Sequence, residues 1–166
     1  MKEQKILRKI ATAKVSAVER FVARDNLEAA NIGGWSKLFD KLFMDMVEEN
    51  VGSAVVTSHM FMRKCTDAPI LNELGFCAEI KLAHFFQLIE RQRDGKRDGK
   101  DGFLQVTGTN NGAHIRGSDG NLWNMHALFR QDEGCWWLLV HPIVLDPSDT
   151  CSPKDSRLLS YDFQST

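Results

Sequence analysis

The stretch Cys135-Trp-Trp-Leu-Leu-Val-His141 decides the fold, because it is apolar on both of the faces that a β-strand presents. Such a strand belongs in the interior of a sheet, where both faces are covered. The segment before it, Leu122–Gln131, alternates between two sets of side chains, and Asp132-Glu133-Gly134 joins the two segments as a tight turn. We therefore predict a hairpin with arms at residues 122–131 and 135–145 in an antiparallel sheet.

Further strands are predicted upstream of this hairpin from β-forming residues and turn signals. Residues 54–62 are rich in Val, Thr, Met and Phe, and residues 103–109 and 113–116 flank the turn sequence Asn110-Asn111-Gly112. Between them, the charged run 91–102 contains Arg-Asp-Gly-Lys twice. We interpret this run as a solvated hairpin tip, with a phosphate contact as the less favoured alternative.

The first third of the chain shows helical spacing instead. Apolar residues three and four positions apart predict a helix over residues 6–23, and a capping-box pattern at Asp25 predicts a short second helix that ends at Gly33. Residues 76–91 fit a strand or a helix, and we interpret them as a strand because a turn-rich run follows. A further helix over residues 35–47 is predicted from one apolar stripe, which contains Trp35, Leu38, Phe39, Leu42, Phe43, Met46 and Val47.

These elements define an α+β fold in which two to three N-terminal helices pack on a curved antiparallel sheet of four to six strands. A single domain is predicted over residues 1–147, since 166 residues is the length of one ordinary domain. Residues 148–166 are predicted to be a C-terminal tail, because Ser, Asp and Pro dominate its first part before apolar character returns at Leu158.

Two segments resemble the NTF2-like superfamily of cone-shaped α+β proteins. Residues 127–141 resemble its last two strands, where an apolar strand, a charged turn with Asp and Gly and a strand that opens with Trp recur. Residues 18–30 resemble its first helix and the segment after it. The resemblance implies a curved sheet covered by N-terminal helices. The enzymes of this family use an Asp/His or Tyr/Asp constellation inside the cone, and no catalytic residue is predicted because no positions here match it.

The composition of the chain bears on which classes of partner we expect. The formal net charge is -1, and charged residues make up 26% of the chain. A nearly neutral chain without a long apolar span gives no reason to expect a nucleic acid or a membrane as partner. The four cysteines form no C-x-x-C pair, so we expect them to be reduced, in a cytoplasmic protein.

No sequence motif for nucleotide, phosphate or metal binding is present, and neither a cofactor nor a metal is predicted. The five histidines all fall in segments that we interpret as strands, without the local spacing of metal ligands. Asn124 and His126 share one face of a predicted strand, and His141 lies on the partner arm. Together with Trp137 they are the predicted ligand-binding residues if that face is covered, and a solvated outer face is the alternative.

Two functions remain open from the sequence. The first is a non-enzymatic binding or interaction module that forms a homodimer through its sheet, because strand 135–145 would leave an apolar face bare and the tail adds apolar residues. Packing of the tail on its own sheet is the alternative to this dimer. The second is a protein with a pocket between sheet and helices that binds a small apolar or polar molecule. Such a protein is either a binding protein or an enzyme of NTF2-like type.

Overall fold

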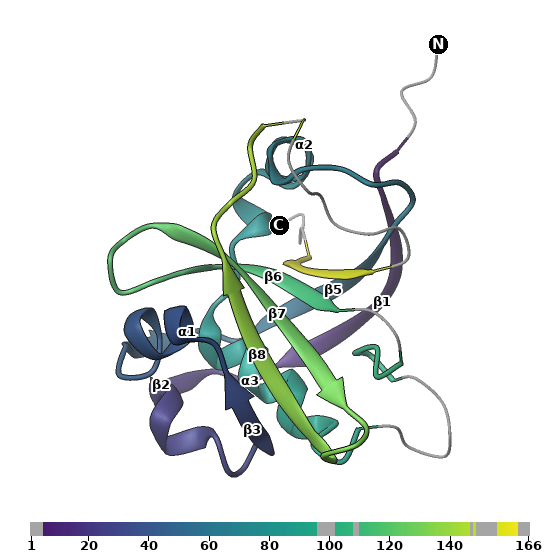
Figure 1. Ribbon diagram of the computed structural model, residues 1–166. Coiled ribbons are helices and arrows are strands. Elements are labelled where there is room, and N and C mark those ends of the chain that lie inside the picture. Colours follow the sequence, from purple (N-terminus) through teal and green to yellow (C-terminus); the bar gives the residue numbers. More distant parts are fainter. Residues whose placement is uncertain (1–4, 96–101, 108–109, 147, 149–155, 163–166) are drawn as a thin grey trace.

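The computed structural model describes residues 5–95, 102–107, 110–146, 148 and 156–162, and it confirms the α+β class (Figure 1). Within these residues, a mixed sheet of seven strands replaces the predicted antiparallel sheet of four to six. The pairs β6–β9 and β3–β8 are parallel, and the other neighbours are antiparallel. Across the sheet the strands are β1 (Leu7–Val15), β5 (Ala54–Phe61), β9 (Arg157–Tyr161), β6 (Asn111–Arg116), β7 (Leu122–Arg130), β8 (Cys135–His141) and β3 (Ile32–Trp35).

The remaining elements are short. A two-stranded sheet joins β2 (Val18–Val22) and β4 (Val47–Val51). The α-helices among the described residues are α1 (Lys37–Leu42), α2 (Asp67–Leu74) and α3 (Leu82–Arg91). Two 3-10 helices, η1 (Ala23–Asn26) and η2 (Gly75–Ala78), complete the fold.

The hairpin that the sequence predicts is confirmed as β7 and β8. Asn124 lies opposite His141, and Arg130 lies opposite Cys135. We call the face that packs on the main hydrophobic core the inner face and the other one the outer face. Alternate residues of the two strands are buried on the inner face, namely Met125, Ala127, Trp136, Leu138 and Val140.

The predicted N-terminal helices are wrong, because residues 7–15 and 18–22 form β1 and β2. A β-bulge shifts the register of β1 between Lys9 and Ala11. The extra residue, Ile10, interrupts the two-residue alternation, so the apolar positions before and after it imitate a helical spacing. The short second helix is also wrong, since η1 spans only Ala23–Asn26.

The predicted helix over residues 35–47 is confirmed only over α1, because Trp35 ends β3 and Val47 begins β4. Its apolar stripe still faces the core in part. Phe39, Leu42 and Phe43 are buried, while Trp35 is 37% exposed. The stripe therefore reports burial at its centre, while Trp35 at one end and Val47, 46% exposed, at the other lie on strands and are exposed.

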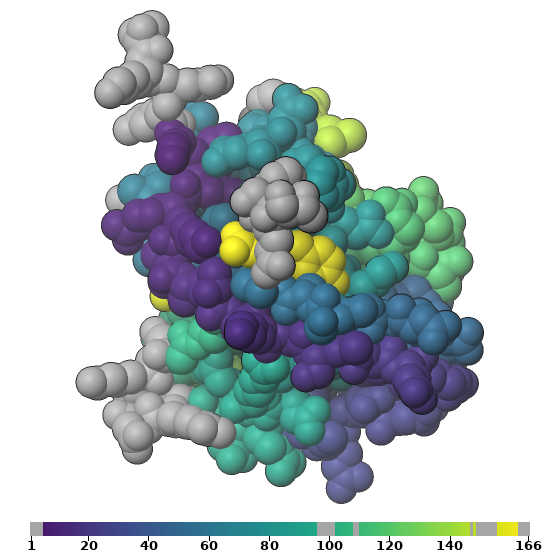
Figure 2. All heavy atoms as spheres, turned by 180° about the vertical axis from the view of Figure 1, so that it is seen from behind, coloured from purple at the N-terminus to yellow at the C-terminus, as the bar shows by residue number. Residues whose placement is uncertain are grey.

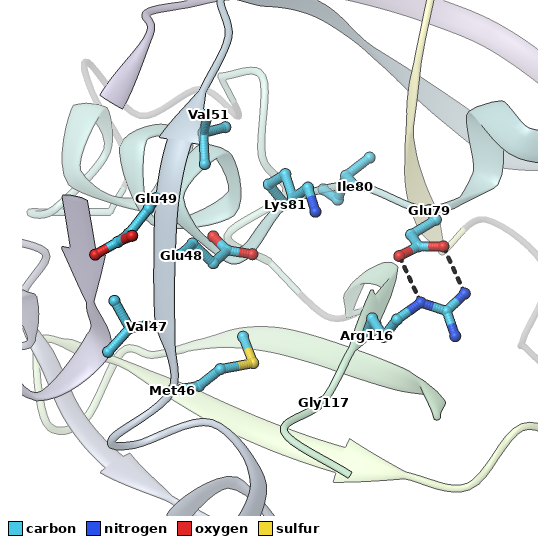
Figure 3. A pocket seen from close by; sticks show the side chains of 10 residues that line it. All are labelled: Met46, Val47, Glu48, Glu49, Val51, Glu79, Ile80, Lys81, Arg116 and Gly117. Carbon is cyan, nitrogen blue, oxygen red and sulfur yellow. Dashed lines mark hydrogen bonds and ion pairs between the residues drawn. The ribbon is translucent and has the colours of Figure 1, made fainter. Parts of the chain in front are cut away.

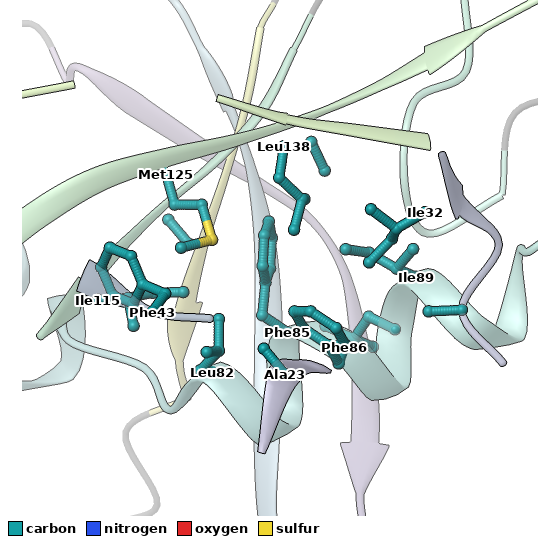
Figure 4. Close-up of a cluster of buried hydrophobic side chains, with 14 of the residues drawn as sticks. Ala23, Ile32, Phe43, Leu82, Phe85, Phe86, Ile89, Ile115, Met125 and Leu138 are labelled. Carbon is teal, nitrogen blue, oxygen red and sulfur yellow. The ribbon is translucent and has the colours of Figure 1, made fainter. Parts of the chain in front are cut away.

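The interpretation of residues 76–91 as a strand is wrong, since α3 occupies Leu82–Arg91. Seven of its ten residues are buried, and Leu82, Phe85, Phe86 and Ile89 keep a helical spacing. The alternation from Phe76 to Leu82 that also fits a strand falls on η2 and on the segment that leads into α3. Figure 4 shows Leu82, Phe85 and Phe86 directed into the cluster that the inner face of the sheet contributes to. The helix places its N-terminus beside β4, where a cleft opens.

Other differences concern the segment between α3 and β6. The described residues 102–107 form no strand, contrary to the prediction for 103–109. Side chains satisfy their backbone instead: Gln92 bonds to both N and O of Leu104, and Gln131 donates to the carbonyl of Val106. The predicted hairpin tip at 91–102 follows a helix, and its residues 96–101 lie outside the described part of the chain.

Residues 157–161, within the region predicted as a tail, form β9 between β5 and β6. The strand is buried on both faces, with Leu159 in the main core and Leu158 in a second cluster. Figure 2, the view from behind, shows the yellow residues of β9 embedded among purple and teal segments. The apolar residues Leu158, Leu159 and Tyr161 are thus part of the chain's own sheet.

Helix α2 covers part of the outer face of the sheet. Its Ile70 packs with Leu7, Phe61 and Leu158 in the second cluster. Apolar residues of β1, β5 and β9 are therefore removed from solvent on both faces of the sheet.

Candidate functional site

A cleft of about 290 Å³ opens between β4 and the segment Glu79–Lys81, and we call it the main cleft (Figure 3). Among the described residues, β4 pairs with β2 alone, which leaves its other side facing the cleft. The opposite wall is fixed because Glu79 forms a β-bridge with His114, and the Ile80 N–H donates to the His114 carbonyl at 3.0 Å. Each wall is thus held by a different partner: β2 holds β4, and β6 holds the segment Glu79–Lys81.

An adjoining hollow of about 380 Å³ shares Glu49, Val51 and Lys81 with the main cleft, and we call it the side hollow. It extends to His84 and Tyr161. Because the two cavities have lining residues in common, they form one furrow beside the start of α3.

An ion pair forms one end of the main cleft. Arg116 Nε and Nη2 donate to the two carboxylate oxygens of Glu79 at 2.9 and 2.7 Å, and Nη1 donates to the Gly120 carbonyl at 2.7 Å. The hydrogen bond from Arg116 holds the pKa of Glu79 below its usual value. The charges of Arg116 and Glu79 are therefore already paired with each other.

The Glu48 carboxylate occupies the N-terminus of α3. Its Oε1 accepts a hydrogen bond from the Ala83 N–H at 2.7 Å, and its Oε2 accepts one from the Leu82 N–H at 3.1 Å. The first N–H groups of a helix lack partners within the helix and carry the positive end of its dipole, so a carboxylate from β4 satisfies both. Glu48 is committed to holding α3 in place.

Lys81 lines both cavities and differs from its charged neighbours. Among the described residues, its ammonium group has no ion pair or hydrogen bond. Figure 3 shows this group over the cleft, between Glu48 and Glu79 in the view, while Glu49 points to the other side of β4. Lys81 is thus the cation of the cleft that remains available to a bound molecule.

Tyr161 and His84 stiffen the wall of the side hollow. The Lys81 N–H donates to Tyr161 Oη at 2.9 Å, and the same oxygen is hydrogen-bonded to His84 Nδ1 at 2.7 Å. Burial raises the pKa of Tyr161 to about 12. Burial also lowers the pKa of His84, despite the opposing effect of the carbonyls of Ser16 and Gly52.

Neither group therefore changes its charge near neutral pH. A general acid or base needs a pKa close to the working pH, and this pair provides none.

None of the four predicted ligand-binding residues lines the main cleft, and they do not form one site. Asn124 is buried against Asp67, while Trp137 lies across Gly34 at the other end of the outer face. The Trp137 indole N–H donates to Glu133 at 2.8 Å, and the Arg130 guanidinium lies 5.4 Å from the ring. Trp137 is therefore held by its own hairpin.

Two of the predicted residues do meet. The rings of His126 and His141 lie edge to face with centroids 5.4 Å apart. Burial, together with the charge of His141, lowers the pKa of His126 to about 4. His84 lies in α3, which corrects the expectation that all five histidines are on strands.

Sequence reasoning missed the residue that organises this region, Asp67. Its Oδ1 accepts hydrogen bonds from His114 Nε2 at 2.7 Å and from Asn124 Nδ2 at 3.1 Å, and its Oδ2 accepts one from the Val144 N–H at 2.7 Å. Burial alone would raise the pKa of Asp67, but these hydrogen bonds outweigh it and leave the pKa below its usual value. The network joins α2 to β6, β7 and the segment after β8.

No signal in the sequence indicates the main cleft or the Asp67 network. The residues of the main cleft come from β4 and the residue before it, from the segment Glu79–Lys81 that precedes α3, and from the end of β6, and their spacing in sequence matches no motif. Among the described residues, no three His, Cys, Asp or Glu side chains are grouped so that they could hold a metal ion. Within the same residues, no helix has the length and apolar character of a membrane span.

No family model matches the chain, and comparisons with curated proteins and with solved structures found no match. The resemblance to NTF2-like proteins therefore stays a prediction. The function has to be argued from the geometry of the cleft.

Proposed function

We propose that this protein is a non-enzymatic binding module that holds a small molecule in the main cleft. The observation that carries the proposal is a concave site in which apolar side chains of Met46, Val51 and Ile80 lie beside one uncommitted cation, Lys81. Ligand sites combine such an apolar lining with a few polar groups that fix orientation.

We propose a binding module and not an enzyme because of the pKa values of the ionisable groups beside the cleft. Tyr161 stays protonated and His84 stays neutral near pH 7, because burial moves the pKa of each away from neutrality. Glu48 and Glu79 are held by the N-terminus of α3 and by Arg116. The described residues of the cleft thus offer binding groups rather than a base and an acid poised for proton transfer.

Self-association through the sheet has less support than this proposal. The argument for a homodimer assumed that one sheet face is bare, and α2 lies on part of that face. The homodimer and the cytoplasmic location remain predictions from the sequence.

The experiment is an NMR screen of the isotope-labelled protein against a fragment library with equal numbers of anionic, neutral and cationic compounds. We expect the fragments that bind to shift the backbone amides of Val51, Lys81 and Gly117, which surround the cleft. The amides of Gly134 and His126 serve as internal controls, because they lie on other elements. Shifts confined to His126 and its neighbours would contradict the proposed site, as would a library that shifts no cleft amide.

A further inference from the structure

We infer that the molecule bound in the main cleft is a small organic acid that carries a single carboxylate on an apolar body; this rests on the proposed function and assigns its ligand class. The inference follows from which charges of the cleft are already paired. Five charged residues line it, and the side chain of one of them, Glu49, points to the other side of β4 (Figure 3). Of the remaining four side chains, three are committed. Arg116 and Glu79 bind each other, and Glu48 holds the N-terminus of α3.

Among the carboxylates directed into the main cleft, a positively charged ligand has no available counterion, since Glu49 points to the other side of β4 (Figure 3). To bind Glu79 it would have to break a two-bond ion pair with Arg116, and to bind Glu48 it would have to strip a carboxylate from two backbone N–H groups. Charge-assisted hydrogen bonds of these kinds are stronger than neutral ones. The ammonium of Lys81 would also repel such a ligand.

A doubly charged anion is disfavoured for a related reason. The carboxylates of Glu48 and Glu79 lie on either side of Lys81 in Figure 3, so the second negative charge of a phosphate ester would face them without a cation of its own. One negative charge matches one available ammonium. The carboxylate is the common organic group that carries such a charge.

The apolar part of the ligand follows from the wall behind Lys81. Met46 is half-buried and packs against the main core, whereas Val51 and Ile80 are only 7% and 1% exposed. Met46 therefore offers accessible apolar surface to a hydrocarbon or aromatic group, whose removal from water contributes affinity in proportion to its area. The side hollow leaves space for a longer body toward Tyr161.

The test compares four compounds that share one ring: benzoate, benzamide, benzylamine and phenyl phosphate. Their dissociation constants are measured from the shifts of the cleft amides in the wild-type protein, in Lys81→Gln and in Lys37→Gln. Lys37 is an exposed residue of α1 and serves as the matched control. We expect benzoate to bind about tenfold more tightly than benzamide, with benzylamine and phenyl phosphate weaker than benzoate.

Lys81→Gln should remove the preference for benzoate over benzamide, and Lys37→Gln should keep it. The benzoate constant should also weaken with added salt while the benzamide constant stays the same, because salt screens only the charged contact. Equal binding of benzoate and benzamide, or tighter binding of phenyl phosphate, would overturn the ligand class but leave the proposed function standing. The fragment screen tests the proposed function separately: if no fragment shifts a cleft amide, the proposed function fails as well.

Discussion

At the scale of single residues, one carboxylate binds three parts of the chain together. Asp67 accepts hydrogen bonds from His114, Asn124 and the Val144 backbone, and its side chain is only 4% exposed. Removing a buried charge partner leaves the remaining polar groups without hydrogen bonds in a site that excludes water. The stability of the region therefore depends on this side chain more than on its surface ion pairs.

We predict that Asp67→Ala lowers the free energy of unfolding by about 3–5 kcal/mol. Chemical denaturation followed by circular dichroism measures the change. Asp132→Ala is the control, because Asp132 pairs with Arg130 on an exposed turn and its loss should hardly move the midpoint. Equal effects of the two substitutions would show that the Asp67 network does not hold α2 on the sheet.

Two partly buried histidines make the stability of the fold depend on pH. Burial, with smaller effects of charged neighbours, lowers the pKa of both His59 and His126 from 6.5 to about 4. The unfolded chain therefore takes up these protons first as the pH falls. The stabilisation is complete above about pH 6.5 and is lost progressively between pH 6.5 and 4.

We predict a loss of about 3 kcal/mol from His126 between pH 7 and pH 4, and a smaller loss from His59, whose charge solvent screens in part. Unfolding free energies measured across this range for the wild type and for His126→Gln test it. The variant should show a shallower dependence on pH, whatever its stability at pH 7. Identical slopes for the two proteins would mean that His126 takes up its proton equally in both states.

At the scale of elements, α3 depends on a carboxylate from another element. We predict that Glu48→Ala lowers the free energy of unfolding by about 1–2 kcal/mol, because it leaves the N–H groups of Leu82 and Ala83 without their acceptor. Hydrogen exchange at the first turn of α3 should accelerate as well. Glu49→Ala, on the other side of the same strand, should change neither quantity, and a change as large as that of Glu48→Ala would refute the capping role.

The sequence predicts those elements whose pattern is local. The β7–β8 hairpin alternates without interruption around a turn, so its place and the shared face of Asn124, His126 and His141 follow from the residues alone. β1 was predicted as a helix because its bulge breaks the alternation, and α3 as a strand because the residues before it alternate and a turn-rich run follows it. The cleft was not predicted, since its walls meet only through long-range pairing.

At the scale of the whole molecule, the C-terminal strand completes the sheet. β9 pairs with β5 on one side and with β6 on the other, so the two parts of the sheet meet through it. No pattern within residues 157–161 reveals this central position, because the order of strands is set by partners far away in the sequence. A polar segment before the strand is what made it resemble a tail.

We predict that a chain ending at Asp146 does not fold cooperatively. Without β9, the edges of β5 and β6 lose their hydrogen-bond partners and Leu158 and Leu159 leave two hydrophobic clusters. Thermal melts by circular dichroism compare the shortened and the full chain. A shortened chain with a sharp transition near that of the full protein would show that β9 is dispensable.

The central claim is that the furrow between β4 and the start of α3 is a ligand site. Crystals of the protein soaked with benzoate test it most directly, because the difference electron density places the compound without a functional assay. The account predicts the ring against Met46 and Ile80 and the carboxylate within hydrogen-bonding distance of Lys81 Nζ. Density for benzoate beside His126 and His141, with the cleft empty in the same crystals, would contradict it.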